Sequence, residues 1–375
     1  MAALALGAAI LWLVALLLPW RPWSTRERVD PVPHGGDGRG PSITALIPAR
    51  NEAATIRDTL QAVLAQPGIT RVVVVDDQSG DDTAPIVASI AASVPGVCVI
   101  PGKATPPGWT GKLWAQQQGL AHVETPLLLL LDADIRLMPG MAPALSRKLQ
   151  DERLDLVSIM ATLPASSWPE KLMLPAFVWF FRQLYPFDWV NRDDRPFAAA
   201  AGGCVLLRRQ KLLEAGGFEA WKNALIDDCE LAARIRDAGG SIWLGLSHGV
   251  QSMRRHPDLA SILETIRRTA YTQLGYSPGL VMVVAGAMLA MFGVPPIALL
   301  GGAFSGDPLL AGAGAAGWLL MALNYAPQVR FSGLGLRWAL ALPLSAMLFL
   351  FATLDSAARH HFGRGAGWKG RRYQR

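Results

Sequence analysis

Acidic residues follow two short apolar runs of the sequence. Asp76 and Asp77 follow the first run, which covers residues 72–75. Asp132 and Asp134 follow the second run, which covers residues 127–131. Carboxylates gathered at strand ends repel one another unless something positive is bound. Asp132 and Asp134 are two residues apart, so on an extended backbone they point the same way. Two hard oxygen ligands on one side suit Mg²⁺ or Mn²⁺, with diphosphate oxygens completing the coordination shell.

Each acidic cluster taken alone also fits an ordinary solvated loop. Asp82 or Thr83 could simply N-cap the helix that follows the first cluster. Short acidic pairs are common by chance, so either cluster alone leaves the two interpretations about even. The presence of both clusters at strand ends favours nucleotide chemistry.

The segments around these acids alternate between strand-like and helical patterns. Apolar runs predict strands at 43–48, 71–75, 97–101 and 127–131, and helical periodicity predicts helices at 52–65, 83–93 and 112–122. Strands that are apolar throughout are typical of a parallel sheet covered on both faces by helices. The expected fold class is therefore α/β, and such sheets bind ligands at the carboxyl ends of their strands.

The composition places this sheet in a membrane-linked protein. Of the 375 residues, 51% are hydrophobic and only 17% are charged, which excludes intrinsic disorder and argues against a purely soluble protein. Three cysteines, Cys98, Cys204 and Cys229, match neither a disulfide framework nor a metal-ligand spacing. The net charge of +6 is concentrated after residue 358, where a basic tail fits anionic lipid better than nucleic acid.

Apolar segments bracket the polar middle of the chain. Residues 1–20 predict an uncleaved anchor, and the arginines that follow it place the next domain in the cytoplasm. We expect an anchor at 1–20, a linker at 21–41, a catalytic domain at 42–276, a transmembrane region at 277–356 and a basic tail at 357–375.

Three apolar runs fill the C-terminal region, at 280–302, 308–326 and 338–354. Three spans would put the basic tail outside, against the positive-inside rule. Either the run that Pro295 and Pro296 should break is re-entrant, or the charge rule fails here.

Residues 168–190 combine many aromatic side chains with three prolines and a few charges. Aromatic side chains prefer the headgroup level of a bilayer, so this stretch predicts an interfacial segment beside an acceptor entrance. The alternative is a core helix of the soluble domain.

An ordered series of motifs resembles a known family. The run 42–52, then Asp76-Asp77-x-Ser79, then Asp132-Ala133-Asp134, is similar to inverting family 2 glycosyltransferases with a GT-A fold. Residues 107–112 resemble a motif of the membrane subgroup that includes ceramide glucosyltransferases and carotenoid-pathway enzymes. Residues 268–274, with the flanking apolar segments, are most similar to the hopene-associated glycosyltransferases.

The resemblance implies roles for residues on the donor side. Asp77 would accept a hydrogen bond from the uracil N3–H of a UDP-sugar. Asp134, helped by Asp132, would hold the divalent metal that neutralises the leaving diphosphate. Lys112 would add positive charge near that diphosphate. Without the resemblance, Lys112 would be interpreted as an exposed residue in the first turn of a helix. The nucleoside pocket would be lined by Ala49, Asn51 and Glu52.

The resemblance also implies roles on the acceptor side. Asp228 would be the general base, although Asp227 stands where the family has Glu, which leaves open which of the two acts. Both acids also suit an ordinary helix start. Gly202 and Gly203 would let a sugar approach the backbone, or form a tight turn. Arg267 and Arg268 could bind the diphosphate, or they could anchor the chain at the membrane surface.

These features together predict a membrane enzyme. It would transfer one sugar from a UDP-sugar to a lipid hydroxyl, an expectation that the resemblance narrows to a hopanoid. The Gln-x-x-Arg-Trp motif of processive polysaccharide synthases is missing, which favours a single transfer. The alternatives are a ceramide, carotenoid or polyprenyl phosphate acceptor, or a non-catalytic scaffold that binds nucleotide sugars. The expected partners are the donor, the lipid and the bilayer of the cytoplasmic membrane, without nucleic acid.

Overall fold

The chain divides into two compact units, each assembled from separate stretches of sequence. The computed structural model describes residues 1–32, 40–362, 367–368 and 371–372. The sheet unit comprises Glu27–Leu163 and Phe187–Arg254, and the helical unit comprises Met1–Arg26, Pro164–Pro186 and Arg255–Arg375. Parts of the expected linker and basic tail lie outside the described residues.

This division differs from the ranges expected from sequence. Residues 164–186 and 255–276, which we expected inside the catalytic domain, group instead with the apolar helices. The reason is that α6 (Trp168–Leu184) and α10 (Leu259–Gln273) pack against those helices, as described below.

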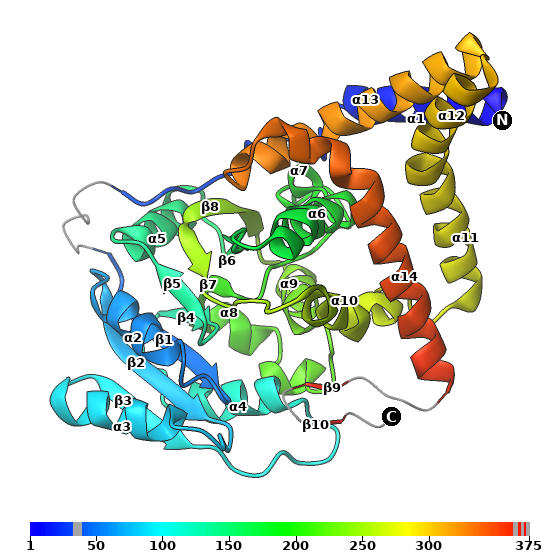
Figure 1. The fold of residues 1–375 in the computed structure, drawn as a ribbon. Helices are drawn as coiled ribbons and strands as arrows, with labels where there is room; N and C mark the ends of the chain where they lie inside the picture. Colours follow the sequence, from blue (N-terminus) through cyan, green and yellow to red (C-terminus); the bar gives the residue numbers. More distant parts are fainter. Residues whose placement is uncertain (33–39, 363–366, 369–370, 373–375) are drawn as a thin grey trace. The chain divides into compact units, whose positions relative to one another are not determined.

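A mixed, mostly parallel sheet forms the sheet unit (Figure 1). Within the described residues it has eight strands, in the order β3-β2-β1-β4-β7-β6-β8-β5. They are β1 (Ile43–Ala49), β2 (Ile69–Asp76), β3 (Val97–Pro101), β4 (Leu127–Leu131), β5 (Ile135–Leu137), β6 (Leu156–Thr162), β7 (Cys204–Arg208) and β8 (Ile242–Ser252). Strand β7 runs antiparallel to both of its neighbours, β4 and β6. The expected α/β class is confirmed.

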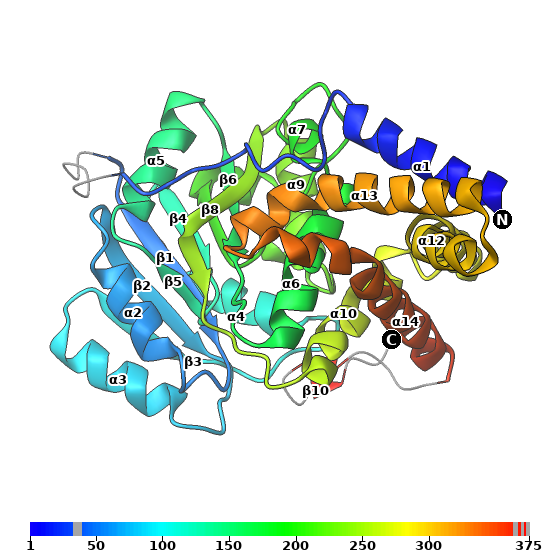
Figure 2. The same cartoon turned by 45° about the horizontal axis from the view of Figure 1, so that its top comes forward.

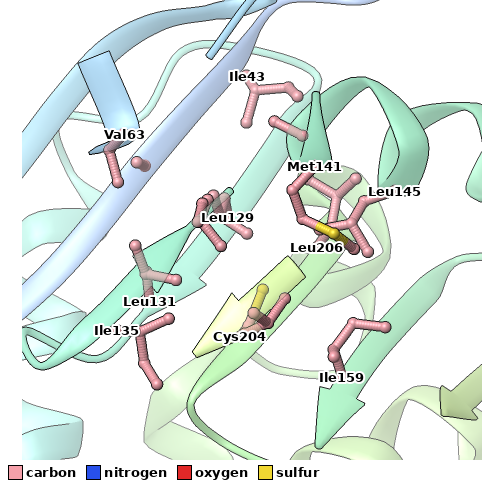
Figure 3. Close-up of a cluster of buried hydrophobic side chains, with 14 of the residues drawn as sticks. Ile43, Val63, Leu129, Leu131, Ile135, Met141, Leu145, Ile159, Cys204 and Leu206 are labelled. Atoms are coloured by element: carbon pink, nitrogen blue, oxygen red, sulfur yellow. The ribbon is translucent and has the colours of Figure 1, made fainter. Parts of the chain in front are cut away.

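Helices cover both faces of the sheet. On one face lie α2 (Ile56–Leu64), α3 (Thr83–Ser93) and α5 (Met141–Asp151), and on the other lies α4 (Gly111–Leu120). Figure 3 shows Leu129 of β4 and Leu206 of β7 in the same buried cluster as Met141 and Leu145 of α5. On the opposite face α4 packs so closely that a Cβ at Gly119 would meet Leu46 and Val75.

Short helices complete the sheet unit around β7. They are α7 (Phe187–Val190), α8 (Arg209–Glu214), a 3₁₀ turn (Phe218–Trp221) and α9 (Asp227–Asp237). Because β7 is antiparallel to β4, the start of β7 lies beside the end of β4, and Cys204 is paired with Leu131. The residues just before β7 therefore meet the acids just after β4.

The helical unit consists mainly of long apolar helices. Its elements are α1 (Ala2–Leu17), α6 (Trp168–Leu184), α10 (Leu259–Gln273), α11 (Pro278–Met288), a π turn (Leu289–Gly293), α12 (Val294–Ser305), α13 (Pro308–Phe331), a 3₁₀ turn (Leu336–Ala341) and α14 (Leu342–His361), with the short pair β9 (Gly367–Trp368) and β10 (Arg371–Arg372). In the described part of the chain, three continuous helices are long and apolar enough to cross a membrane, at Pro278–Ser305, Pro308–Phe331 and Leu336–His361.

The expectation that Pro295 and Pro296 break the first apolar run is wrong. The helix continues from Pro278 to Ser305 and includes a π turn at Leu289–Gly293. The two prolines occupy the first turn of α12, immediately after that turn. A proline fits best in a first turn, and a π turn reorganises the hydrogen bonds that precede it.

Two other helices of this unit differ from a simple anchor or surface segment. Helix α1 has 16 residues, fewer than the about 20 of a full span, and it runs beside α13 (Figure 2). Helix α6 buries Trp179 and Arg182 and packs against α10, α13 and α14. Trp168 at its start is 60% exposed, so only part of the predicted interfacial stretch presents an aromatic ring outward.

Candidate functional site

Side chains join the loops that follow β1 and β2. The Arg50 guanidinium donates to the backbone carbonyl of Asp77 over 2.5 Å and lies 3.9 Å from a carboxylate oxygen of the same residue. Asp77 is buried, with 1% of its surface exposed. The Asn51 N–H donates to Ser79 Oγ over 3.0 Å, and Asn51 Oδ1 accepts from the Gly80 N–H over 2.8 Å.

Two residues of these loops have a left-handed backbone. The φ angles are +52° at Asn51 and +58° at Gln78. Such conformations cost energy in non-glycine residues and concentrate at ligand-binding sites. The local contacts therefore hold the predicted nucleoside loops in a strained, preformed arrangement.

Ala49 and Glu52, which were also predicted to line the nucleoside pocket, make different contacts. The side chain of Ala49 belongs to the hydrophobic core, so Ala49 could meet a nucleoside only through its backbone. The Glu52 N–H donates to Thr83 Oγ1 over 2.7 Å, and a carboxylate oxygen of Glu52 accepts from Thr55 Oγ1 over 3.3 Å. Glu52 thus fixes the start of α2 beside the start of α3.

Lys112 connects the two acidic groups of the site. Its Nζ lies 3.0 Å from Asp132 Oδ1 and 3.4 Å from Asp227 Oδ2. Burial opposes the charge of this lysine, but the carboxylates of Asp132, Asp227 and Asp228 outweigh burial and hold the pKa of Lys112 above its usual value. Lys112 is therefore a permanent cation between the end of β4 and the start of α9.

The start of α4 is fixed where Lys112 needs it. Lys112 is the second residue of this helix, and the N–H of the preceding Thr110 donates to the carbonyl of Lys222 over 2.7 Å. Lys222 directly follows the 3₁₀ turn at Phe218–Trp221, which leads on to α9. This backbone bond therefore links the lysine and the acid pair of α9 through a short stretch of chain.

Asp228 is held by two backbone donors. Its Oδ2 accepts from the Gly202 N–H over 2.8 Å, and its Oδ1 accepts from the Cys229 N–H over 2.9 Å. Burial, followed by repulsion from Asp227, raises the pKa of Asp228 to about 6. A carboxyl group with a pKa near 6 is ionised at neutral pH and accepts a proton more readily than an ordinary aspartate.

Gly202 and Gly203 lie at the point where β7 meets β4. The Gly203 carbonyl accepts from the Asp132 N–H over 3.0 Å. A Cβ at Gly202 would lie 3.2 Å from Asp228 Oδ2 and 3.2 Å from Lys112 Nζ, tighter than ordinary contact. Glycine at 202 therefore lets the lysine and the acid approach the backbone together.

Asp134 is the more buried acid of the pair after β4, at 8% exposure. Its Oδ2 lies 3.7 Å from Arg254 Nε, and its backbone carbonyl accepts from the Met253 N–H over 2.8 Å. In the described residues, no three His, Cys, Asp or Glu side chains gather as a metal-binding group. Asp132 and Asp134 offer carboxylate oxygens, the ligand type that a divalent ion shared with a diphosphate would need.

The two arginines proposed for the diphosphate lie on a helix of the other unit. Arg267 and Arg268 belong to α10 of the helical unit. Arg267 Nε lies 2.6 Å from an oxygen of Asp355 on α14, and its Nη1 lies 3.5 Å from Glu264. The contacts of Arg267 therefore tie α10 to α14.

Two cations of the site, Arg50 and Arg254, have no role assigned by the sequence motifs. Arg50 lies inside the motif at 42–52 without an assigned role. Arg254 follows β8, whose direction and neighbours were not predicted. For Arg50 the available signal was a basic residue directly after an apolar strand.

Comparison by sequence matches part of the chain, including the donor-side residues, to a family model. Residues 44–215 match the family model "Glycosyl transferase family 2". The match covers a little under half of the chain and includes β1, β2, β4, Lys112 and the glycines before β7. It ends before the acid pair of α9.

Similar proteins are also glycosyltransferases. The 4,4'-diaponeurosporenoate glycosyltransferase of Staphylococcus aureus (strain bovine RF122 / ET3-1) is 37% identical over 95 residues, and that of strain USA300 is 36% identical over 94 residues. Each alignment covers 25% of this chain and 24% of the relative, so the chain spans about a quarter of the relatives' length.

A solved structure shares the fold over most of the chain. The mannosyltransferase of Pyrobaculum calidifontis, in complex with GDP-Man and Mn²⁺, gives a TM-score of 0.58 at 18% identity. The alignment covers 92% of this chain and 98% of that protein. This likeness confirms the expected GT-A fold.

Proposed function

We propose that this chain is a membrane glycosyltransferase that moves one sugar from a nucleoside diphosphate sugar to a lipid hydroxyl, with inversion. The observation that carries the proposal is the bridge from Asp132 through Lys112 to Asp227. It joins the acids that would face the donor diphosphate to the acid pair that would face the acceptor. The family match and the glycosyltransferase relatives support the same reaction.

Asp228 is the general base of this proposal. Its raised pKa and its two backbone hydrogen bonds give a basic carboxylate in a fixed position. As this carboxylate takes the acceptor hydroxyl proton, the hydroxyl oxygen bonds to the anomeric carbon. The bond to the donor phosphate oxygen breaks, and its electrons leave with the nucleoside diphosphate. Repulsion from Asp227, which lies 3.4 Å from Lys112, contributes to the raised pKa of Asp228.

The donor side needs positive charge where the diphosphate leaves. Lys112 supplies a permanent cation there, and such preorganised charge stabilises the developing negative charge. Asp134, with Asp132, would hold Mg²⁺ or Mn²⁺, which supplies further neutralisation of the leaving group. The Mn²⁺ in the Pyrobaculum calidifontis complex supports a divalent ion in this fold.

The donor nucleotide proposed first is UDP. Buried Asp77, oriented by Arg50, suits an imide N–H of the base, and the resemblance in the sequence implies uracil. A GDP-sugar is the second candidate, because guanine also offers N–H donors on one edge. The solved structure that shares the fold holds GDP-Man.

The acceptor proposed first is a hopanoid alcohol, as the motif at 268–274 implies. The alternative is a carotenoid acid, since the Staphylococcus aureus relatives are named for one, and its carboxylate would need no base. The three apolar helices support a lipid acceptor in the bilayer. The arginines after residue 20 support the cytoplasmic membrane, with the sheet unit facing the cytoplasm.

The test combines a donor panel with an acceptor panel. The full chain in detergent with Mn²⁺ would receive UDP-glucose, UDP-galactose, UDP-N-acetylglucosamine or GDP-mannose. Each donor would be paired with a hopanoid alcohol, a carotenoid acid, ceramide or polyprenyl phosphate. Nucleotide release and lipid product would be measured together.

The proposal expects one donor to give product with a lipid alcohol. Product only with an ionised acceptor, a carboxylate or a phosphate, would contradict the role of a base, because such acceptors carry no proton to remove. Donor binding without turnover on any acceptor would leave the scaffold interpretation.

A further inference from the structure

Each acid proposed to hold the metal already has a cationic side chain beside it. Lys112 Nζ lies 3.0 Å from Asp132 Oδ1, and Arg254 Nε lies 3.7 Å from Asp134 Oδ2. The two cations come from unrelated elements, the start of α4 and the residues after β8. This arrangement neutralises both carboxylates without any ion.

A divalent ion on these acids would repel both cations. Like charges within a few ångströms in a partly buried site interact strongly, and little screening by salt reaches them. A nucleoside diphosphate changes this balance, because it places several negative charges next to the ion. Lysine and arginine are the usual side-chain partners of phosphate, and arginine can grip it with two parallel hydrogen bonds.

Both cations have room to change partners. The Arg254 side chain is 41% exposed and that of Lys112 is 20% exposed. The backbone beside Arg254 stays tied to the site, because the Met253 N–H donates to the Asp134 carbonyl over 2.8 Å. Lys112 keeps a second carboxylate, Asp227, at 3.4 Å. Only the side-chain ends need to move.

We propose that Lys112 and Arg254 are exchangeable internal counter-ions. Without donor they neutralise Asp132 and Asp134, and when the metal and the nucleoside diphosphate bind they transfer to the diphosphate. This inference rests on the proposed function. It assigns Arg254 a role as a diphosphate ligand, which no motif indicated.

The exchange predicts how metal and nucleotide affect each other. Metal alone must displace both cations and therefore binds weakly, whereas metal with nucleoside diphosphate gives the cations a new partner. In the native chain, UDP or GDP should tighten Mn²⁺ binding by about tenfold or more, within the usual range of coupling between two ligands. By reciprocity, Mn²⁺ should tighten nucleotide binding by the same factor.

The experiment measures Mn²⁺ binding to the full chain in detergent by calorimetry, with and without UDP or GDP. Arg254→Met should bind Mn²⁺ alone more tightly than the native chain and should lose most of the nucleotide effect. Arg254→Lys, which keeps the charge, should recover much of it, and Arg254→Gln should behave as Arg254→Met does. Lys112→Met should show the same pattern as Arg254→Met.

Arg136→Met is the matched control. Arg136 lies two residues from Asp134 in the sequence, but its ion pair is with Asp58, over 3.0 Å, and with neither metal acid. Its removal deletes a nearby positive charge and should change neither the Mn²⁺ affinity nor the nucleotide effect.

The outcomes separate this inference from the proposed function. If nucleotide binds but every Arg254 and Lys112 variant shows the native coupling, the exchange is wrong and the proposed function stands. If Arg254→Met weakens Mn²⁺ alone, Arg254 is a structural partner of Asp134 and the exchange is again wrong. If neither UDP nor GDP binds to the native chain, the proposed donor class fails, and the exchange fails with it.

Discussion

At the scale of single residues, the site depends on how Asp228 is kept basic. Burial disfavours its charged form, Asp227 repels it, and the pKa of Asp228 rises to about 6. Lys112 opposes this rise, as do the N–H groups of Gly202 and Cys229. The balance leaves a carboxylate that is ionised at neutral pH and still a useful base.

The pH profile of the reaction should report this group. The base acts only when it is ionised, so kcat/KM should be level above about pH 7 and should fall about tenfold per pH unit below pH 6. In Asp227→Asn the repulsion is lost, and the inflection should move to lower pH. Steady-state rates between pH 5 and 8 would check both statements. An inflection that stays in place in Asp227→Asn would show that Asp227 does not set the pKa.

Gly202 is the residue whose side chain would disturb the site most directly. A Cβ there would press on Asp228 and Lys112 at 3.2 Å, and α9 holds Asp228 in place. Gly202→Ala should lower kcat by about ten- to a hundredfold through misplacement of the base. Gly7→Ala, where a Cβ would meet nothing within 4 Å, is the control and should keep native activity. Equal kcat values for the two variants would contradict the close packing.

At the scale of elements, α9 fixes the loop before β7 at two points. At its start, Asp228 accepts from the Gly202 N–H. Near its end, the Arg236 guanidinium donates to three backbone carbonyls at 2.7–2.9 Å, those of Val190, Arg192 and Arg195. The helix that carries the acid pair therefore also positions the glycines that the pair needs.

Loss of the Arg236 contacts should loosen this loop. Arg236→Met should lower the free energy of unfolding by about 2 kcal/mol, because hydrogen bonds from a charged group are lost and carbonyls are left without a donor. Arg236→Lys should recover only part of this loss, since an ammonium cannot reproduce the planar fork. Denaturant titration of the three proteins would measure it. A methionine variant as stable as the native chain would exclude the clamp.

The strands show which features the sequence could predict and which it could not. The strands with Asp77 and Asp132 at their ends were predictable, because an apolar run and the acid after it need no knowledge of distant contacts. The reversed direction of β7 was not, since an apolar strand reads the same in either direction. Arg254 was missed for the same reason, because its place beside Asp134 depends on the pairing of β8.

The helical unit shows which features composition alone leaves open. Aromatic and apolar residues at 168–190 suit an interfacial helix and also a buried one, and the sequence did not predict that α6 packs against α10, α13 and α14. Pro295 and Pro296 indicated a break because proline lacks an N–H donor. A π turn before them allows the helix to continue, and no sequence signal marked that turn.

At the scale of the whole molecule, the apolar helices should bind the chain to a membrane. In the described residues three helices are long enough to span one, and large apolar side chains on them are exposed, such as Phe304 at 91% and Met282 at 69%. Such surface is stable only when lipid covers it.

Fractionation of cells that express the chain would test this attachment. The protein should stay in the membrane pellet through a high-salt wash and an alkaline carbonate wash, and detergent should release it. Release by carbonate would mean that the helices do not insert, and release by salt alone would assign the attachment to basic residues.

The central claim is that Asp228 is the base of a sugar transfer to a lipid hydroxyl. The most direct measurement compares single-turnover rates of lipid glycosylation by the native chain, Asp228→Asn and Asp237→Asn, with donor affinity measured beside them. Asp237 is the exposed last residue of the same helix, so its variant controls for charge and fold. The account expects Asp228→Asn to bind donor normally and to lose at least about a thousandfold in rate, with Asp237→Asn unchanged. Native-like turnover by Asp228→Asn would contradict it.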